Sequence, residues 1–412
     1  MNNYHTYTLN NGLRVIHLPS DSPVVYCGIG VRAGSCQEET GKEGVAHFCE
    51  HVTFKGTARR SALQILNTLE RVGGDLNAFT NKEDTVFYAA ILRDHLPKAV
   101  DLLCDIVFHS TYPDTEVGRE LDVICDEIES YNDSPADLIY DDFENLIFQG
   151  HALGHNILGR AEELRRMTSQ DVRNFVERLY LPTRMVLYVY GNVPMTTIVR
   201  EAVKALRKAR ERESGAETLS VVRQAPTLYT PRHVEVEKAA HQAHVMMGVR
   251  TFAATDPRHL HLYVLNNMLG GPGMNSRLNL SLRERNGLVY NVESASVGYT
   301  DTGVWTVYFG CDPHDVVRCK KLVMRELAHL TERPLSASVL EAAKRQIMGQ
   351  AGISYDSFEN VAINMGKRFL HYNTTQTYEA LCQRVQALTS EELFHTAREV
   401  FVPENISTMM FV

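Results

Sequence analysis

The sequence of 412 residues lacks features that mark several protein classes. No segment approaches the run of about 20 apolar residues that spans a bilayer, and the start, MNNYHTYTLNNGLRV, lacks the charged and apolar regions of a secretory signal. The eight cysteines form no CxxC pair and no spacing typical of a structural zinc site or a disulfide framework. These absences predict free thiols, no membrane partner and a cytoplasmic location.

An excess of positive charge is also missing, because 42 basic residues stand against 50 acidic ones and the formal net charge is -8. A chain of that sign without a local basic patch has no general attraction for nucleic acid. The sequence contains no GxxxxGK[ST], GxGxxG or GxSxG segment, so nucleotide-dependent and serine-nucleophile enzymes find no support. We therefore expect no nucleic-acid partner.

Two segments, Thr168–Tyr190 and Thr389–Phe411, follow one pattern at a constant offset and without a gap. Each begins with Thr-Ser, continues through the apolar positions of an amphipathic helix, and ends with a proline and a β-rich run. Such self-similarity indicates that one structural unit occurs twice in the chain. The alternative is that any helix-Pro-strand segment would look alike.

Hydrophobic periodicity predicts an α+β fold rather than alternating βαβ units. The expected strands are 14–17, 24–31 and 84–92. The expected helices are 44–54, 62–72, 95–108, 116–131 and 169–180. The charged and polar stretch 207–233 is typical of a linker. We predict two homologous α+β domains, 1–206 and 234–412, each an antiparallel-rich sheet packed with helices.

The segment GVAHFCEHVTFKGT, residues 44–57, contains two histidines and a glutamate with helical spacing. A helix here places an apolar stripe on one side and His47, Glu50 and His51 on the opposite side. Two imidazoles at i and i+4 can reach one metal ion, and the intervening acid shares their face. The alternative is an ordinary polar helix face.

A catalytic zinc ion usually has three protein ligands and an open position, so a further ligand is needed. The predicted helix 116–131 carries Glu116, Glu120 and Glu127 along one flank of its apolar stripe. A carboxylate at the edge of a buried stripe is better tolerated when a metal shares its charge. Glu127 or Glu120 could be the third ligand with the other supporting it, and helix geometry does not choose between them.

The order His47-Phe48-Cys49-Glu50-His51 is HxxEH, and HFCEHVTFKGT resembles the active-site helix of the pitrilysin/insulinase metallopeptidases, in the branch of the processing peptidases. The segments RAGSCQEE, 73–88, 151–159 and 270–292 also resemble signatures of that family, so the resemblance covers nearly the whole chain. In the family the third ligand follows the second histidine by about 75 residues, inside a VIxxEI-like segment. Glu127 lies at that distance, in VICDEI.

The resemblance implies that His47, His51 and Glu127 bind one zinc ion per chain. It also implies that Glu50 is the general base that takes a proton from the attacking water. Glu120 matches an additional acid of the family that supports the ligands. The activity implied is that of a zinc metalloendopeptidase.

Substrate binding is also implied by the resemblance. Asn77, Ala78 and Phe79 begin an expected strand edge to which extended substrate would pair through its backbone, although an ordinary hairpin turn is the alternative from the sequence alone. Arg283 and Tyr290 match the arginine and tyrosine that the family uses to hold substrate.

A chain of this length resembles half of the large single-chain insulinases, and in the short-chain branch two subunits close around a chamber. Because the zinc motif and the Arg/Tyr pair occur on one chain, we expect a homodimer whose active sites are completed in trans. The substrates would be peptides or unfolded segments. The alternative is a catalytically silent structural, assembly or peptide-binding subunit of the same family.

Overall fold

The computed structural model describes residues 4–207, 229–238 and 241–412, so most of the predicted linker, 208–228, lies outside the described residues. The chain divides into two compact units, each of which combines segments from both halves of the sequence. Unit 1 contains the described residues of Met1–Ile128, Asn156–Val221 and Ile353–Thr377. Unit 2 contains those of Glu129–His155, Val222–Gly352 and Tyr378–Val412.

Unit 1 is built on a six-stranded sheet with the order β1-β2-β6-β3-β5-β4. Its strands are β1 (His5–Thr8), β2 (Arg14–Pro19), β3 (Val24–Val31), β4 (Asp75–Thr80), β5 (Thr85–Leu92) and β6 (Met185–Gly191). The strands pair antiparallel except for β2 and β6, which are parallel. The predicted α+β class is confirmed, and the three predicted strands correspond to β2, β3 and β5.

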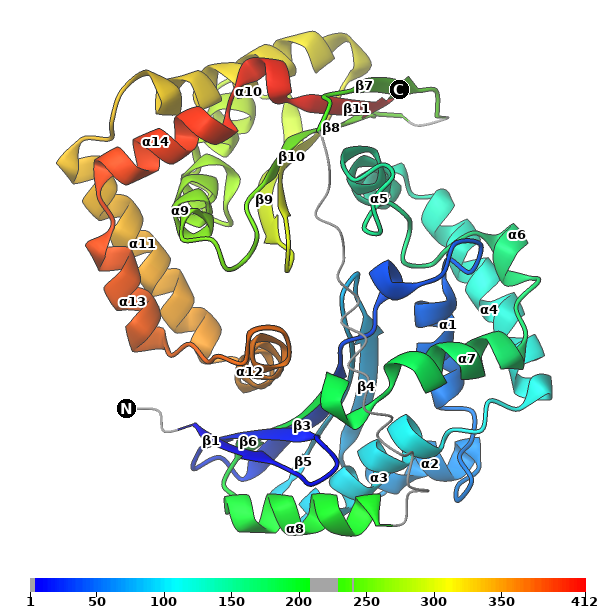
Figure 1. The fold of residues 1–412 in the computed structure, drawn as a ribbon. Helices are drawn as coiled ribbons and strands as arrows, with labels where there is room; N and C mark the ends of the chain where they lie inside the picture. Colours follow the sequence, from blue (N-terminus) through cyan, green and yellow to red (C-terminus); the bar gives the residue numbers. More distant parts are fainter. Residues whose placement is uncertain (1–3, 208–228, 239–240) are drawn as a thin grey trace. The chain divides into compact units, whose positions relative to one another are not determined.

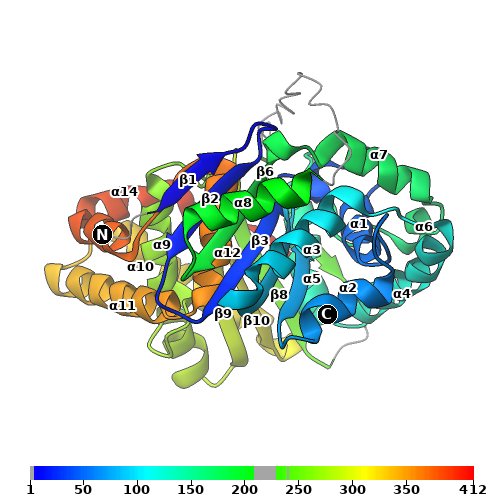
Figure 2. The same cartoon turned by 90° about the horizontal axis from the view of Figure 1, so that it is seen from below.

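Helices from the first half of the sequence share an apolar core with one face of this sheet. They are α1 (Val45–Thr53), α2 (Ala62–Glu70), α3 (Leu96–His109), α4 (Asp114–Asn132), α6 (Ala161–Leu164), α7 (Ser169–Leu179) and α8 (Met195–Leu206). Figure 2 shows α3 and α8 running beside the strands, and α3 packs against β3 and β5. Buried side chains of these helices and of the sheet form one continuous apolar core.

The opposite face of the unit 1 sheet is covered by α12 (Phe358–Tyr372), which comes from the second half of the sequence (Figure 1). The helix packs on β6 and β3 and buries Ala362, Met365 and Leu370 against the sheet. Gly366 lets the helix approach closely, because a Cβ atom there would lie 2.3 Å from the ring of Tyr188. A separate apolar cluster therefore joins the two halves of the sequence within unit 1.

Unit 2 has a five-stranded sheet with the order β7-β11-β8-β10-β9. Its strands are β7 (His233–Val236), β8 (Ala243–Thr251), β9 (Val289–Gly298), β10 (Gly303–Cys311) and β11 (Ser407–Phe411), and only the β7–β11 pair among them is parallel. Its own helices are α9 (Arg258–Gly270), α10 (Val316–Glu332), α11 (Ala337–Tyr355), α13 (Tyr378–Ala387) and α14 (Ser390–Val400). Helix α5 (Pro135–Ile147), from the first half, packs on β8 and β11.

The repeated segment found in the sequence is also repeated in the structure. Thr168 caps α7 and Thr389 caps α14, and each hydroxyl accepts from the third backbone N–H of its helix, that of Asp171 or Glu392. Each helix is followed by a short 3-10 turn that begins at a proline and by a strand, β6 or β11. The predicted duplication therefore corresponds to one local structure formed twice.

The structure also describes the cysteines and the hydrophobicity of the helices. All eight cysteines lie in the described part of the chain, and none of them is part of a disulfide bond. No helix within the described ranges is long and apolar enough to cross a membrane.

Candidate metal centre

Helix α1 begins where the backbone makes a turn that favours glycine. Gly44 has a φ of 96°, and a Cβ atom there would lie 2.7 Å from the carbonyl oxygen of Leu158. The carboxylate of Glu38 accepts hydrogen bonds from the backbone N–H groups of Gly44 at 2.9 Å and Ala46 at 2.7 Å. A negative charge at a helix N-terminus is favourable, so these contacts fix the start of the helix.

The predicted apolar stripe of α1 is buried, and its two histidines are directed to a common point. Val45, Phe48, Cys49 and Val52 are all buried in the unit 1 core. His47 and His51 keep part of their side chains exposed and each turns Nε2 toward Glu127 of α4. The Nε2 atoms of His47 and His51 lie 3.9 Å and 3.7 Å from carboxylate oxygens of Glu127.

These three side chains form a group with the chemistry of a zinc site. One ligand atom from each of His47, His51 and Glu127 lies within 4.8 Å of the other two. Ligand atoms of one tetrahedral zinc ion, bonded at about 2.0–2.2 Å, lie roughly 3.3–3.6 Å apart. The observed separations are close to that spacing, and two imidazoles with one carboxylate are a donor set found at catalytic zinc. The residues present therefore fit a zinc ion.

The surroundings of the two imidazoles bear on which ring nitrogens face Glu127. Burial, together with the neighbouring His51, lowers the pKa of His47 to about 3, so His47 is neutral near neutral pH. The Nδ1 atom of His51 lies 3.1 Å from Oε1 of Glu120. A carboxylate oxygen at this position accepts a hydrogen bond from Nδ1, which favours the tautomer that presents the Nε2 lone pair on the side of Glu127.

Glu50 is more buried than its place opposite the apolar stripe suggests, with 8% of its surface exposed. The side chain of Glu50 is covered by the end of β4, which contacts α1. There the hydroxyl of Thr80 donates to Oε2 of Glu50 at 2.6 Å. Burial raises the pKa of Glu50, and the hydrogen bond from Thr80 partly opposes that rise. A carboxylate with a raised pKa beside a metal position is suited to accept and return a proton.

The strand that carries Thr80 is an edge strand. Among the described residues β4 pairs only with β5, so its other side has no strand partner. Asn77, Ala78 and Phe79 lie in this strand, which ends at the residue that contacts Glu50. The backbone of an edge strand can pair with an extended peptide. The predicted strand edge is thus present, next to Glu50.

Arg283 and Tyr290 belong to unit 2 and contact one another. Arg283 lies in a π-helical segment, Asn279–Glu284, and Tyr290 lies in β9. The guanidinium carbon of Arg283 is 5.5 Å from the centre of the Tyr290 ring. Tyr290 is 82% exposed, and Gly287 between the two residues turns the chain with a φ of 61°. The predicted pair therefore forms one exposed cation–π contact.

Comparison with known proteins places the chain in a family. Residues 14–161 match the family profile described as insulinase (peptidase family M16), and residues 166–347 match the one described as peptidase M16 inactive domain. The sequence is 34% identical to an uncharacterized zinc protease of Streptomyces coelicolor over 95% of this chain and 86% of that protein. The chain belongs to the insulinase (peptidase M16) family.

Other family relatives match over the same extent. The uncharacterized zinc protease YmxG of Bacillus subtilis is 32% identical over 97% of this insulinase-family chain and 96% of its own length. Solved structures share the fold. A protease from Helicobacter pylori aligns with a TM-score of 0.92 at 22% identity over 100% of both chains. A peptidase M16 inactive domain from Pseudomonas fluorescens aligns with a TM-score of 0.90 at 20% identity, over 99% of this chain and 97% of that one.

Two residues at the centre were not identified from the sequence. Thr80 contacts Glu50, and Lys55 contacts Glu120 with Nζ 2.6 Å from Oε2. Neither residue type is a metal ligand or a proton-transfer group in this setting, so a search for reactive side chains passes over both. Lys55 lies four residues after His51, and this helical spacing was the one feature of the sequence that could have linked the lysine to the metal-binding face.

Proposed function

We propose that this insulinase-family chain is a zinc-dependent endopeptidase. The observation that carries the proposal is the group formed by His47, His51 and Glu127, with the carboxylate of Glu50 on the same helix as both imidazoles. The relatives of Streptomyces coelicolor and Bacillus subtilis carry the name zinc protease, which supports the same activity. One zinc ion per chain would occupy this group.

In this mechanism His47, His51 and Glu127 would hold the metal. When bound, zinc supplies Lewis-acid activation of a water molecule and of the scissile carbonyl group. Glu50 takes a proton from the attacking water and returns it to the leaving amine. Thr80 holds the carboxylate of Glu50 in place by its hydrogen bond, and Glu120 fixes the orientation of His51.

The substrate would lie as an extended segment along Asn77, Ala78 and Phe79 of β4, paired with the strand through its backbone. Pairing through the backbone requires an unfolded segment and gives weak sequence specificity. Peptides and unfolded segments are therefore the proposed substrates, and folded proteins are excluded. Arg283 and Tyr290, exposed on unit 2, would hold the substrate through donated hydrogen bonds.

The experiment that tests the activity compares the zinc-loaded wild type with Glu50→Gln on a mixed pool of quenched peptides. Glutamine keeps the size of the side chain but cannot accept the proton, so turnover should fall by several orders of magnitude while the zinc content stays the same. Glu70→Gln, at an exposed position of α2, is the matched control and should retain full turnover.

Each result of this comparison decides between two functions. Cleavage by the wild type and by Glu70→Gln, but not by Glu50→Gln, supports the endopeptidase and the role of Glu50. Normal cleavage by Glu50→Gln contradicts that role. If the folded, zinc-loaded wild type cuts no peptide in the pool, the chain is better described as a silent assembly or peptide-binding subunit.

We also propose that the active form is a homodimer whose sites are completed in trans, since the chain carries both the metal-binding group and the Arg283/Tyr290 pair. Mixing two inactive variants, Glu50→Gln and Arg283→Ala, tests this. Random exchange between dimers should restore about a quarter of the wild-type sites. A fully active monomer, or a mixture that stays inactive although subunits exchange, would contradict completion in trans.

A further inference from the structure

Lys55 is joined to the candidate metal centre through one carboxylate. Its Nζ atom lies 2.6 Å from Oε2 of Glu120, and Oε1 of Glu120 lies 3.1 Å from Nδ1 of His51. The line of contacts therefore runs from the lysine through the glutamate to an imidazole whose Nε2 faces Glu127. We propose that Lys55 is a positioning residue, which holds Glu120 so that Glu120 orients His51 toward the metal. This inference rests on the proposed function.

The burial of Glu120 explains why it needs the lysine. The Glu120 side chain is 9% exposed, whereas that of Lys55 is 30% exposed. A nearly buried carboxylate is costly unless its oxygens are paired. His51 satisfies one oxygen, and Lys55 satisfies the other with a charge. Without the lysine, Glu120 is free to turn toward solvent, and the Nδ1 atom of His51 then loses its acceptor.

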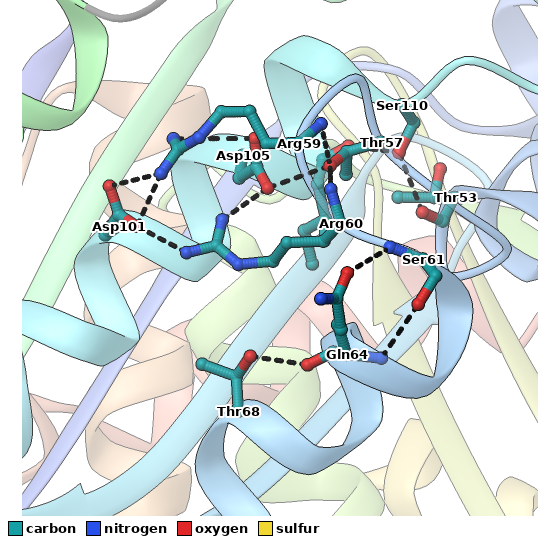
Figure 3. Close-up of polar contacts among 11 residues, drawn as sticks. Thr53, Thr57, Arg59, Arg60, Ser61, Gln64, Thr68, Asp101, Asp105 and Ser110 are labelled. Atoms are coloured by element: carbon teal, nitrogen blue, oxygen red, sulfur yellow. Dashed lines mark hydrogen bonds and ion pairs between the residues drawn. The ribbon is translucent and has the colours of Figure 1, made fainter.

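The chain is fixed before and after Lys55 by contacts with α3 and with Ser110, the residue that follows α3 (Figure 3). The hydroxyl of Ser110 donates to the carbonyl oxygen of Thr53, the last residue of α1, at 2.7 Å. The hydroxyl of Thr57 donates to Oδ2 of Asp105 at 2.9 Å, and the guanidinium of Arg60 binds the same fully buried carboxylate. The backbone between Thr53 and Thr57 is therefore held, which limits where the ammonium group can lie.

A purely electrostatic role of the lysine predicts the opposite result from a positioning role. A positive charge close to a metal site repels the cation, so its removal alone would tighten zinc binding. Loss of a residue that orients a ligand weakens metal binding, typically by about 10–100-fold. The sign of the change in zinc affinity therefore separates the two roles.

The experiment measures the zinc dissociation constant of the full chain by competition with a chromogenic chelator. Lys55→Met should weaken zinc binding by at least about tenfold. Lys55→Gln, which keeps a polar end without the charge, should do the same, and Lys55→Arg should recover part of the affinity. Lys42→Met is the matched control, because Lys42 forms an ion pair of similar length with Asp171, at 2.7 Å, and is 40% exposed. The control should bind zinc as the wild type does.

A double-mutant cycle then asks whether the lysine acts through Glu120. In a Glu120→Gln background, Lys55→Met should change the zinc affinity by less than about twofold, since the contact it would disturb is already gone. An effect of full size in that background, or unchanged or tighter binding by the single variants, overturns the proposal. A wild type that binds no zinc refutes the proposed function itself, whereas a zinc-binding, active wild type with unaltered Lys55 variants refutes only this inference.

Discussion

Asp84 ties α12 to the turn between β4 and β5, and its replacement by asparagine tests how that helix is held. The carboxylate is 4% exposed and lies 2.8 Å from Nε2 of His371 and 3.4 Å from Nζ of Lys367, both on α12. Asn81 donates to the same carboxylate at 2.7 Å. Asp84→Asn keeps the shape of the side chain and removes its charge, so both contacts to α12 lose their charge assistance.

The expected size of the effect follows from these contacts. Hydrogen bonds to charged groups contribute about 1.5–3 kcal/mol and neutral ones about 0.5–1.5 kcal/mol, so Asp84→Asn should lower the free energy of unfolding by about 2–3 kcal/mol. For a unit of this size that corresponds to a Tm lower by roughly 5–10 °C. Thermal unfolding followed by circular dichroism gives the Tm, and hydrogen exchange should show faster opening of α12.

The pH dependence gives a second test of the same contact. Burial alone would raise the pKa of Asp84, but the hydrogen bond from His371 and the charge of Lys367 lower it below its usual value. The carboxylate therefore contributes stability above about pH 4, and this is lost as the pH falls through the lowered pKa. The Tm difference between wild type and variant should shrink in acid. If Asp84→Asn lowers the free energy of unfolding by less than about 1 kcal/mol at neutral pH, the reasoning is wrong. An effect equal to that of the exposed control Asp94→Asn would contradict it as well.

Three further predictions concern helix packing, acid stability and the metal. Gly366→Ala should lower the free energy of unfolding by about 1–3 kcal/mol in urea titrations, because the added Cβ atom meets a buried tyrosine ring. The control Gly349→Ala, which has open space around it, should raise that free energy by up to about 1 kcal/mol. Equal effects of the two variants would be inconsistent with the packing described. Burial would raise the pKa of Asp101, but hydrogen bonds from two arginines lower it to about 2. The ionised carboxylate therefore stabilises the wild type above about pH 4, and this stabilisation is lost toward pH 2 and should be absent in Asp101→Asn. The same dependence of stability on pH in wild type and variant would argue against this. Removal of zinc by a chelator should lower the Tm, since a ligand at about 100 times its Kd stabilises by about 2.7 kcal/mol, and a Tm insensitive to chelation would count against the metal site.

Local structure was predictable from the sequence because periodicity and capping are local. The predicted strand 24–31 is β3, and the predicted helix 44–54 contains α1, whose apolar stripe is buried as expected. The sheet that a helix covers is a long-range property that periodicity does not report. Nothing in the periodicity therefore indicated that α5 and α12 each pack on the sheet formed mainly by the other half of the sequence.

The candidate site shows the same division between local and distant information. The spacing of His47 and His51 suggested a metal pair directly, but the two glutamates of α4 could be told apart only through the family resemblance. In the structure Glu127 faces both Nε2 atoms, while Glu120 lies at Nδ1 of His51. One helical face thus presents two carboxylates to opposite sides of an imidazole, which sequence spacing alone does not specify.

The placement of α12 sets an order for folding during synthesis. The last strand of the unit 1 sheet, β6, is complete at Gly191, but α12 is not complete until Tyr372. Until then the apolar side chains of Ile16, Val86 and Val186 on that face lack the helix that buries them in the finished protein. A ribosome adds residues at about 5–20 per second, so this face stays open for roughly 10–40 seconds. The growing chain therefore passes through a stage at which chaperone binding to this sheet face would be most effective.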